Sequence, residues 1–159
     1  HTEAGGYGLA SSAVMDERRL VLVVNGMTSD NARINESERL LNYGFRNFGI
    51  YDMLKANQVI ETADVWLGEV STVPLISEVD ITLSMNKQIR RKMAAKVIYD
   101  GPIAAPIQKG QPIATLELSA DGMETKSYPL LAGSDIAELS GIKRIKAAFL
   151  FMLMGSVSD

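Results

Sequence analysis

Few residues of this chain could do chemistry, and they do not assemble into a recognisable active site. Cysteine is absent and the only histidine is His1, which excludes thiolate nucleophiles, disulfides and metal sites built from cysteine or several histidines. Ser11 and Ser12 carry hydroxyl groups, but no base accompanies them, and we interpret them as strand serines. Glu36 and Glu38 lie among arginines at helical spacing, which is typical of a solvated helix face with i,i+3 ion pairs.

The composition is that of a folded protein. The chain has 159 residues, of which 47% are hydrophobic and 22% charged, enough for one ordinary domain or two small ones. The net charge of −3 argues against nucleic-acid binding, because such proteins need a basic surface to displace counterions.

The first 54 residues predict two strands followed by a helix. Residues 5–14 and the β-branched run 20–24 flank a charged turn, which is typical of an antiparallel hairpin. Residues 27–30 (Met-Thr-Ser-Asp) offer oxygen acceptors for the first turn of a helix. Four apolar side chains then recur at helical spacing and predict one buried face, and Gly49 is a plausible stop; they are Ile34, Leu41, Phe45 and Phe48.

Strand patterns replace the helical period over residues 56–133 and predict a small all-β sandwich or barrel. Two apolar runs, 59–60 and 65–67, flank a turn-like Ala63-Asp64, and apolar residues alternate over 79–84. Residues 95–99 and 113–118 are similar, and Asp121-Gly122 is a hairpin signal. We expect Trp66, the only tryptophan, to be largely buried in this domain.

Residues 134–159 predict a final helix that Asp135 can cap. Apolar residues recur from Ile136 at spacings of three and four, and the apolar run 147–154 is too short to span a bilayer. Cations beside an apolar run favour a helix that lies on an anionic membrane surface, although a helix packed on a protein core is the alternative. The expected membrane-contacting residues are Lys143, Arg144, Lys146, Phe149, Leu150 and Phe151.

Three segments, in order, resemble low-molecular-mass penicillin-binding proteins of the D-alanyl-D-alanine carboxypeptidase type. Residues 1–13, with His-Thr first and a Gly-Tyr pair before an Ala-Ser-Ser-Ala strand, resemble the segment that follows the family's Lys-Thr-Gly motif. Residues 36–45, with Glu-Ser before Leu-Leu and Gly-Phe, resemble its closing helix. Residues 105–111, Ala-Pro-Ile-Gln-Lys-Gly-Gln, resemble the signature of its C-terminal β domain. The resemblance covers essentially the whole chain.

The resemblance implies an acyl-transfer enzyme without metal or organic cofactor, of which this chain is the C-terminal part. The Ser nucleophile and its Lys base, the Ser-x-Asn triplet and Lys-Thr-Gly would all precede His1, so the chain as given would be inactive. By resemblance, the backbone N–H of His1 belongs to the oxyanion hole, and His1 and Thr2 contact substrate; a leftover tag residue is the alternative for His1. The parent protein would act on peptidoglycan pentapeptide stems and bind β-lactams.

The predicted organisation has three parts. Residues 1–54 would be the last two strands and last helix of a penicillin-binding, β-lactamase-like domain. Residues 56–133 would be the all-β domain, and 134–159 a membrane-associating helix at the outer face of the bacterial inner membrane, in the periplasm. Two alternatives stay open: an independent β-type module that spaces or docks other cell-wall proteins, and a peripheral structural protein of the membrane.

Overall fold

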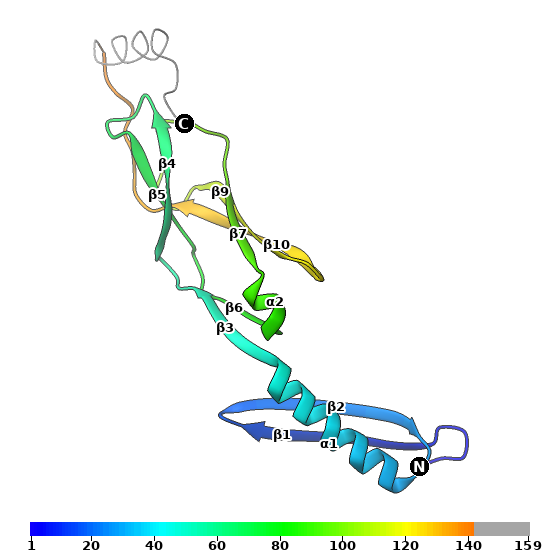
Figure 1. Cartoon of the computed structure of the whole chain (residues 1–159). Helices are drawn as coiled ribbons and strands as arrows, with labels where there is room; N and C mark the ends of the chain where they lie inside the picture. The colour runs from blue at the N-terminus through cyan, green and yellow to red at the C-terminus, as the bar shows by residue number, and fades with distance from the viewer. Residues whose placement is uncertain (142–159) are drawn as a thin grey trace. The chain divides into compact units, whose positions relative to one another are not determined.

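A computed structural model describes residues 1–141, which fold into two compact units (Figure 1). We call the first the hairpin unit; it contains His1–Tyr51 and Ser84–Arg91. The second, the sheet unit, contains Asp52–Leu83 and, among the described residues, 92–141. The predicted domain limits, 1–54 and 56–133, stay a prediction.

The hairpin unit begins with the predicted pair of antiparallel strands. β1 (Tyr7–Met15) pairs with β2 (Arg18–Met27), so that Ser11 lies opposite Leu22 and Ser12 opposite Val21. Asp16 and Glu17 form the two-residue turn with φ of 49° and 62°, because only left-handed turn residues match the twist of such a hairpin.

One long helix, α1 (Asp30–Asn47), packs against both strands (Figure 1). The predicted start is confirmed: the Ser29 side chain accepts the Ala32 N–H at 3.1 Å and caps the helix. The predicted apolar face is only partly right. Phe45 is buried, but Ile34 is 50% exposed, and Phe48 lies beyond the helix in the next strand. The helix therefore ends before Gly49, when Phe48 turns to an extended conformation.

A two-stranded sheet and a short helix follow. β3 (Phe48–Leu54) pairs with β6 (Ile81–Asn86). The predicted alternation over 79–84 is confirmed in β6, where Ile81, Leu83 and Met85 are buried, whereas Val79 is exposed ahead of the strand. Directly after it comes α2 (Lys87–Arg91), which the sequence pattern did not predict.

A six-stranded sheet forms the sheet unit. Its spatial order is β7-β9-β10-β5-β4-β8, antiparallel except for the parallel pair β4–β8. The β-rich prediction is confirmed, and Asp121-Gly122 does form the turn between the two longest strands, with φ of 78° at the glycine. The bounds are β4 (Val59–Trp66), β5 (Thr72–Ile76), β7 (Ala94–Ile98), β8 (Ile103–Ala104), β9 (Pro112–Ala120) and β10 (Met123–Ala132).

The core of this unit is apolar, and it corrects two predictions. Its largest fully buried apolar side chains are Val73, Leu75, Ile107, Leu118 and Leu130. Ala63 does not mark a turn; it is fully buried in the middle of a continuous β4. Trp66 is not largely buried but 39% exposed; it is the last residue of β4 and pairs with Ala104 of the two-residue edge strand β8.

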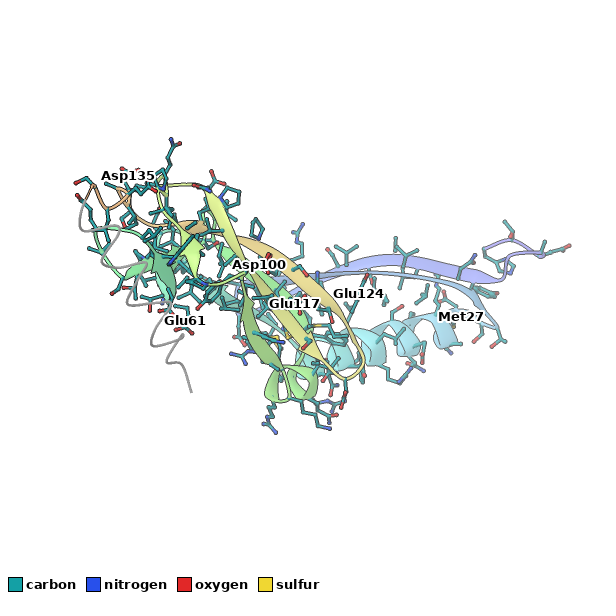
Figure 2. All side chains as sticks on the ribbon, turned by 90° about the horizontal axis from the view of Figure 1, so that it is seen from above. Met27, Glu61, Asp100, Glu117, Glu124 and Asp135 are labelled. Atoms are coloured by element: carbon teal, nitrogen blue, oxygen red, sulfur yellow. The ribbon has the colours of Figure 1, made fainter. Side chains whose placement is uncertain are left out.

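The end of the described chain corrects a third prediction, since residues 134–141 are extended and not helical. Ile136 is 5% exposed and pairs with Ile107 through two backbone hydrogen bonds of 2.9 Å. Asp135, labelled in Figure 2, accepts the Lys109 N–H at 2.8 Å instead of capping a helix. Long-range pairing thus overrides the helical period here. The predicted helix beyond residue 141 lies outside the described residues.

Candidate functional site

The residues that the resemblance singled out lie at one end of the hairpin unit. The rings of His1 and Tyr7 face each other, with centroids 4.0 Å apart and planes inclined by 33°. Thr2 closes a tight turn: its N–H and carbonyl pair with Gly6, and its hydroxyl oxygen accepts the Gly5 N–H at 2.9 Å. This turn leads directly into β1, whose Tyr7 lies opposite Met27 (Figure 2). His1 and Thr2 are both exposed.

Arg33, from the first turns of α1, joins this end of the unit, and sequence reasoning had placed it on a solvated face. Its guanidinium donates to the Gly8 carbonyl at 3.2 Å, pairs with Asp30 and lies 5.9 Å from the centre of the Tyr7 ring. Its Nε is buried without a hydrogen-bond partner. The group offers hydrogen-bond donors and a positive charge, but it contains no nucleophile with a base, so it can hold a ligand and cannot by itself break an amide bond.

The remaining charges on α1 behave as the sequence suggested. Arg39 donates to both carboxylate oxygens of Glu36, with distances of 2.8 and 2.5 Å. The hydrogen bond from Arg39 lowers the pKa of the Glu36 carboxyl below its usual value. The pair is an exposed i,i+3 ion pair, and it gives no sign of a catalytic carboxylate, whose pKa is commonly raised.

Sequence reasoning overlooked two tetrapeptides with the Ser-x-x-Lys spacing, Ser84-Met85-Asn86-Lys87 and Ser140-Gly141-Ile142-Lys143. In the first, the serine lies in strand β6 and the lysine is the first residue of α2. In the second, the lysine lies outside the described residues. A nucleophile and its base must lie within hydrogen-bond reach of each other. No hydrogen bond joins Ser84 to Lys87 in the described part of the chain, so the first match shares only the residue spacing of the motif.

The Ser-x-Asn pattern also occurs twice, as Ser29-Asp30-Asn31 and as Ser84-Met85-Asn86 within β6. Ser29 is the N-cap of α1, and Asp30 is the partner of Arg33. The first triplet therefore serves the start of the helix.

Among residues 1–141, no three His, Asp or Glu side chains converge closely enough to hold a metal ion. Neither helix in that range has the length and apolar content needed to cross a bilayer. The predicted membrane-contacting residues, from Lys143 to Phe151, lie outside the described part of the chain.

These features define a class of protein: a β-rich domain that follows a strand–strand–helix segment. Residues 48–138 match the family described as "Penicillin-binding protein 5, C-terminal domain". This chain belongs to that family, as the three sequence segments had indicated.

The curated relatives carry one enzyme name. The chain is 32% identical over 138 residues to D-alanyl-D-alanine carboxypeptidase DacC of Escherichia coli, covering 86% of this chain and 34% of the relative. It is 34% identical to D-alanyl-D-alanine carboxypeptidase DacA of Haemophilus influenzae, covering 87% of this chain and 36% of the relative. The chain thus spans about a third of the length of the curated relatives it matches.

Solved structures agree with this fold. Penicillin-binding protein 5 from Haemophilus influenzae matches with a TM-score of 0.64 and 31% identity, over 87% of this chain and 41% of that one. The D-alanyl-D-alanine carboxypeptidase DacD from Francisella tularensis matches with a TM-score of 0.68 and 28% identity, over 87% and 35%.

Proposed function

We propose that this chain is the C-terminal portion of a serine-type D-alanyl-D-alanine carboxypeptidase of the bacterial cell wall. The observation that carries the proposal is the family match over 48–138, together with relatives that are named as this enzyme. The parent protein would remove the terminal D-alanine from peptidoglycan stem peptides: a serine attacks the D-Ala–D-Ala amide, D-alanine leaves, and water hydrolyses the ester. β-Lactams would acylate the same serine.

The hairpin unit would contribute the last strands and helix of the catalytic domain. Its two strands support this, because the face away from α1 is also apolar: Val21 and Val23 are 72% and 74% exposed. Leu20, on the other face, reaches Gly44 of α1. Strands that are apolar on both faces are typical of the interior of a larger sheet covered on both sides. In that sheet the backbone N–H of His1 would serve the oxyanion hole, and His1 and Thr2 would contact the substrate.

The sheet unit would act as a spacer between that domain and the membrane. It has its own apolar core, and the chain continues from it into the sequence with Lys143, Arg144 and Lys146 beside the apolar run 147–154. We propose that this segment associates with the outer face of the inner membrane, which would place the protein in the periplasm.

A labelling experiment tests the enzymatic part of the proposal. The chain of residues 1–159 should show no labelling by fluorescent penicillin and no release of D-alanine, because the proposed nucleophile, its lysine and the Lys-Thr-Gly strand would all precede His1 in the parent protein. The protein translated from the whole gene should be labelled, and its sequence should read Lys-Thr-Gly immediately before His1. A whole-gene protein without Ser-x-x-Lys upstream, or without labelling, would refute the proposed activity.

Labelling of residues 1–159 themselves would contradict the assignment of the missing nucleophile. Ser84→Ala and Ser140→Ala are then the deciding variants, since they remove the two serines that have a lysine three residues later. Ser71→Ala, at another exposed serine, is their control.

A further inference from the structure

The loop between β4 and β5 presents apolar side chains to solvent. Val70 is 51% exposed and Trp66, at the end of β4, is 39% exposed. They border a hollow of about 600 Å³ on the sheet unit. We name residues 66–70 the tryptophan loop. The hollow is lined by Val65, Trp66, Leu67, Gly68, Glu69, Val70, Ser71 and Leu139.

Backbone hydrogen bonds fix this loop to the end of the described chain. The Glu69 N–H donates to the Ala137 carbonyl at 2.9 Å, and the Leu139 N–H donates to the Leu67 carbonyl at 2.8 Å. The segment coloured orange runs beside the loop in Figure 1. Leu67 holds a left-handed φ of 57° between these bonds. The loop is thus an anchored part of the unit.

The tether to the proposed membrane segment is short. Lys143 follows Leu139 by four residues, which span at most about 14 Å even when fully extended. A bilayer surface at the backbone of Lys143 therefore lies no more than about 14 Å from Leu139, which is hydrogen-bonded to Leu67 of the tryptophan loop. A membrane interface accommodates the loop's exposed apolar side chains, because tryptophan is enriched at the level of the headgroups.

We propose that the tryptophan loop is a second contact with the lipid surface, so that the sheet unit rests on the membrane as well as being tied to it. This inference depends on the proposed membrane association of the C-terminal segment. Charge indicates how the loop binds. The acidic residue Glu69 lines the hollow, and Glu138 pairs with Gly68 of the loop. The residues that line the hollow include no lysine or arginine. The attraction between the loop and lipid is therefore apolar and is not weakened by salt, in contrast to that of Lys143, Arg144 and Lys146.

The single tryptophan makes the inference directly measurable in the unmodified chain. Residues 1–159 are mixed with vesicles of phosphatidylethanolamine and phosphatidylglycerol, and binding is verified by co-sedimentation. On binding, Trp66 emission should shift to the blue, acrylamide should quench it less, and lipids brominated in the acyl chain should quench it. A blue shift without quenching by the brominated lipids would show that the chain's own C-terminal segment covers Trp66, and would overturn the inference.

A matched pair of variants supplies the energetic test. Val70→Ser should raise the lipid concentration for half-maximal binding by roughly threefold, by the same factor at low and high salt. Val79→Ser is the control: Val79 is 59% exposed and lies beyond the other end of β5, so its replacement should leave binding unchanged. Equal binding by the two variants would refute the loop's contact with lipid.

The two proposals fail separately. If the chain co-sediments while Trp66 emission and acrylamide quenching are unchanged, the loop inference is wrong and the C-terminal attachment stands. If the chain does not co-sediment at all, the proposed membrane association is wrong and the loop inference falls with it.

Discussion

Arg18 is the residue that closes the C-terminal end of α1. Its guanidinium donates to the carbonyl oxygens of Phe45, at 2.9 Å, and Phe48, and lies 5.2 Å from the centre of the Phe45 ring. The last carbonyls of a helix lack partners within it and carry partial negative charge, so a cation there satisfies both needs. One side chain from β2 thus ties the helix to the hairpin.

Replacing Arg18 should therefore destabilise the hairpin unit. We expect Arg18→Met to cost about 1–3 kcal/mol, because hydrogen bonds to charged groups contribute about that much. Arg19→Met is the matched control: Arg19 is the exposed neighbour, and its replacement should stay within about 0.5 kcal/mol. Chemical denaturation followed by circular dichroism measures both, and equal losses would refute the capping role.

Burial at single positions predicts a second contrast, within the sheet unit. Leu130 is fully buried, and Leu130→Ala should cost about 2–5 kcal/mol through lost transfer energy and a cavity. Because Trp66 is 39% exposed, Trp66→Ala should cost less than the ~3–5 kcal/mol typical of a core tryptophan. Thermal denaturation of both variants checks this order, and a larger loss for Trp66→Ala would show that the indole belongs to the core.

At the scale of elements, a charged cluster joins the segment before β4 to the segment after β5. Lys55 contacts Asp52 at 3.1 Å and Asp80 at 3.3 Å. The Thr82 hydroxyl, and then Lys55, lower the pKa of the Asp52 carboxyl; the Ala56 N–H, and then Lys55, lower that of Asp80. Asp52, and then Asp80, raise the pKa of the Lys55 ammonium.

These shifts predict how stability depends on pH. The carboxyls have lower pKa values when folded, so their contribution is present above the ordinary Asp pKa of about 4 and is lost as pH falls through the folded values. The Lys55 contribution is present below the ordinary Lys pKa of about 10.4 and is lost as pH rises through its raised value. Asp80→Asn should flatten the acid side of the melting-temperature profile. Asp64→Asn, at an exposed position of β4, is the control and should leave the acid side of the profile unchanged. Identical melting-temperature profiles for the two variants would exclude the charged cluster as the cause.

At the scale of the whole molecule, the structure decides where the membrane segment can be separated from the fold. Ending the chain at Gly133 would remove Ile136, which is 5% exposed and paired with Ile107. We expect that shortened chain to melt at a lower temperature. A chain that ends at Gly141 keeps this pairing and should retain its melting temperature.

The chain that ends at Gly141 should lose sedimentation with anionic vesicles, whereas residues 1–159 should sediment. Replacing Lys143, Arg144 and Lys146 with Gln should weaken binding mainly at low salt, because salt screens the attraction of cations to anionic lipid. Phe149→Asp should weaken it at any salt, because burial of apolar area is not screened. Equal sedimentation of the full and shortened chains would leave residues 142–159 without a membrane role.

What the sequence determined by itself was the local structure and the family. Ser29 caps α1, Asp121-Gly122 turns β9 into β10, and the apolar alternation gives strands, because each of these depends on atoms within a few residues. The tertiary structure decided what is buried. Ile136 pairs with Ile107 instead of forming the predicted helix, Trp66 lies at the end of its strand, and Ser84 and Lys87 belong to different elements. Such outcomes depend on partners far away in the chain, and local periodicity carries no information about which distant backbone will supply the hydrogen bonds.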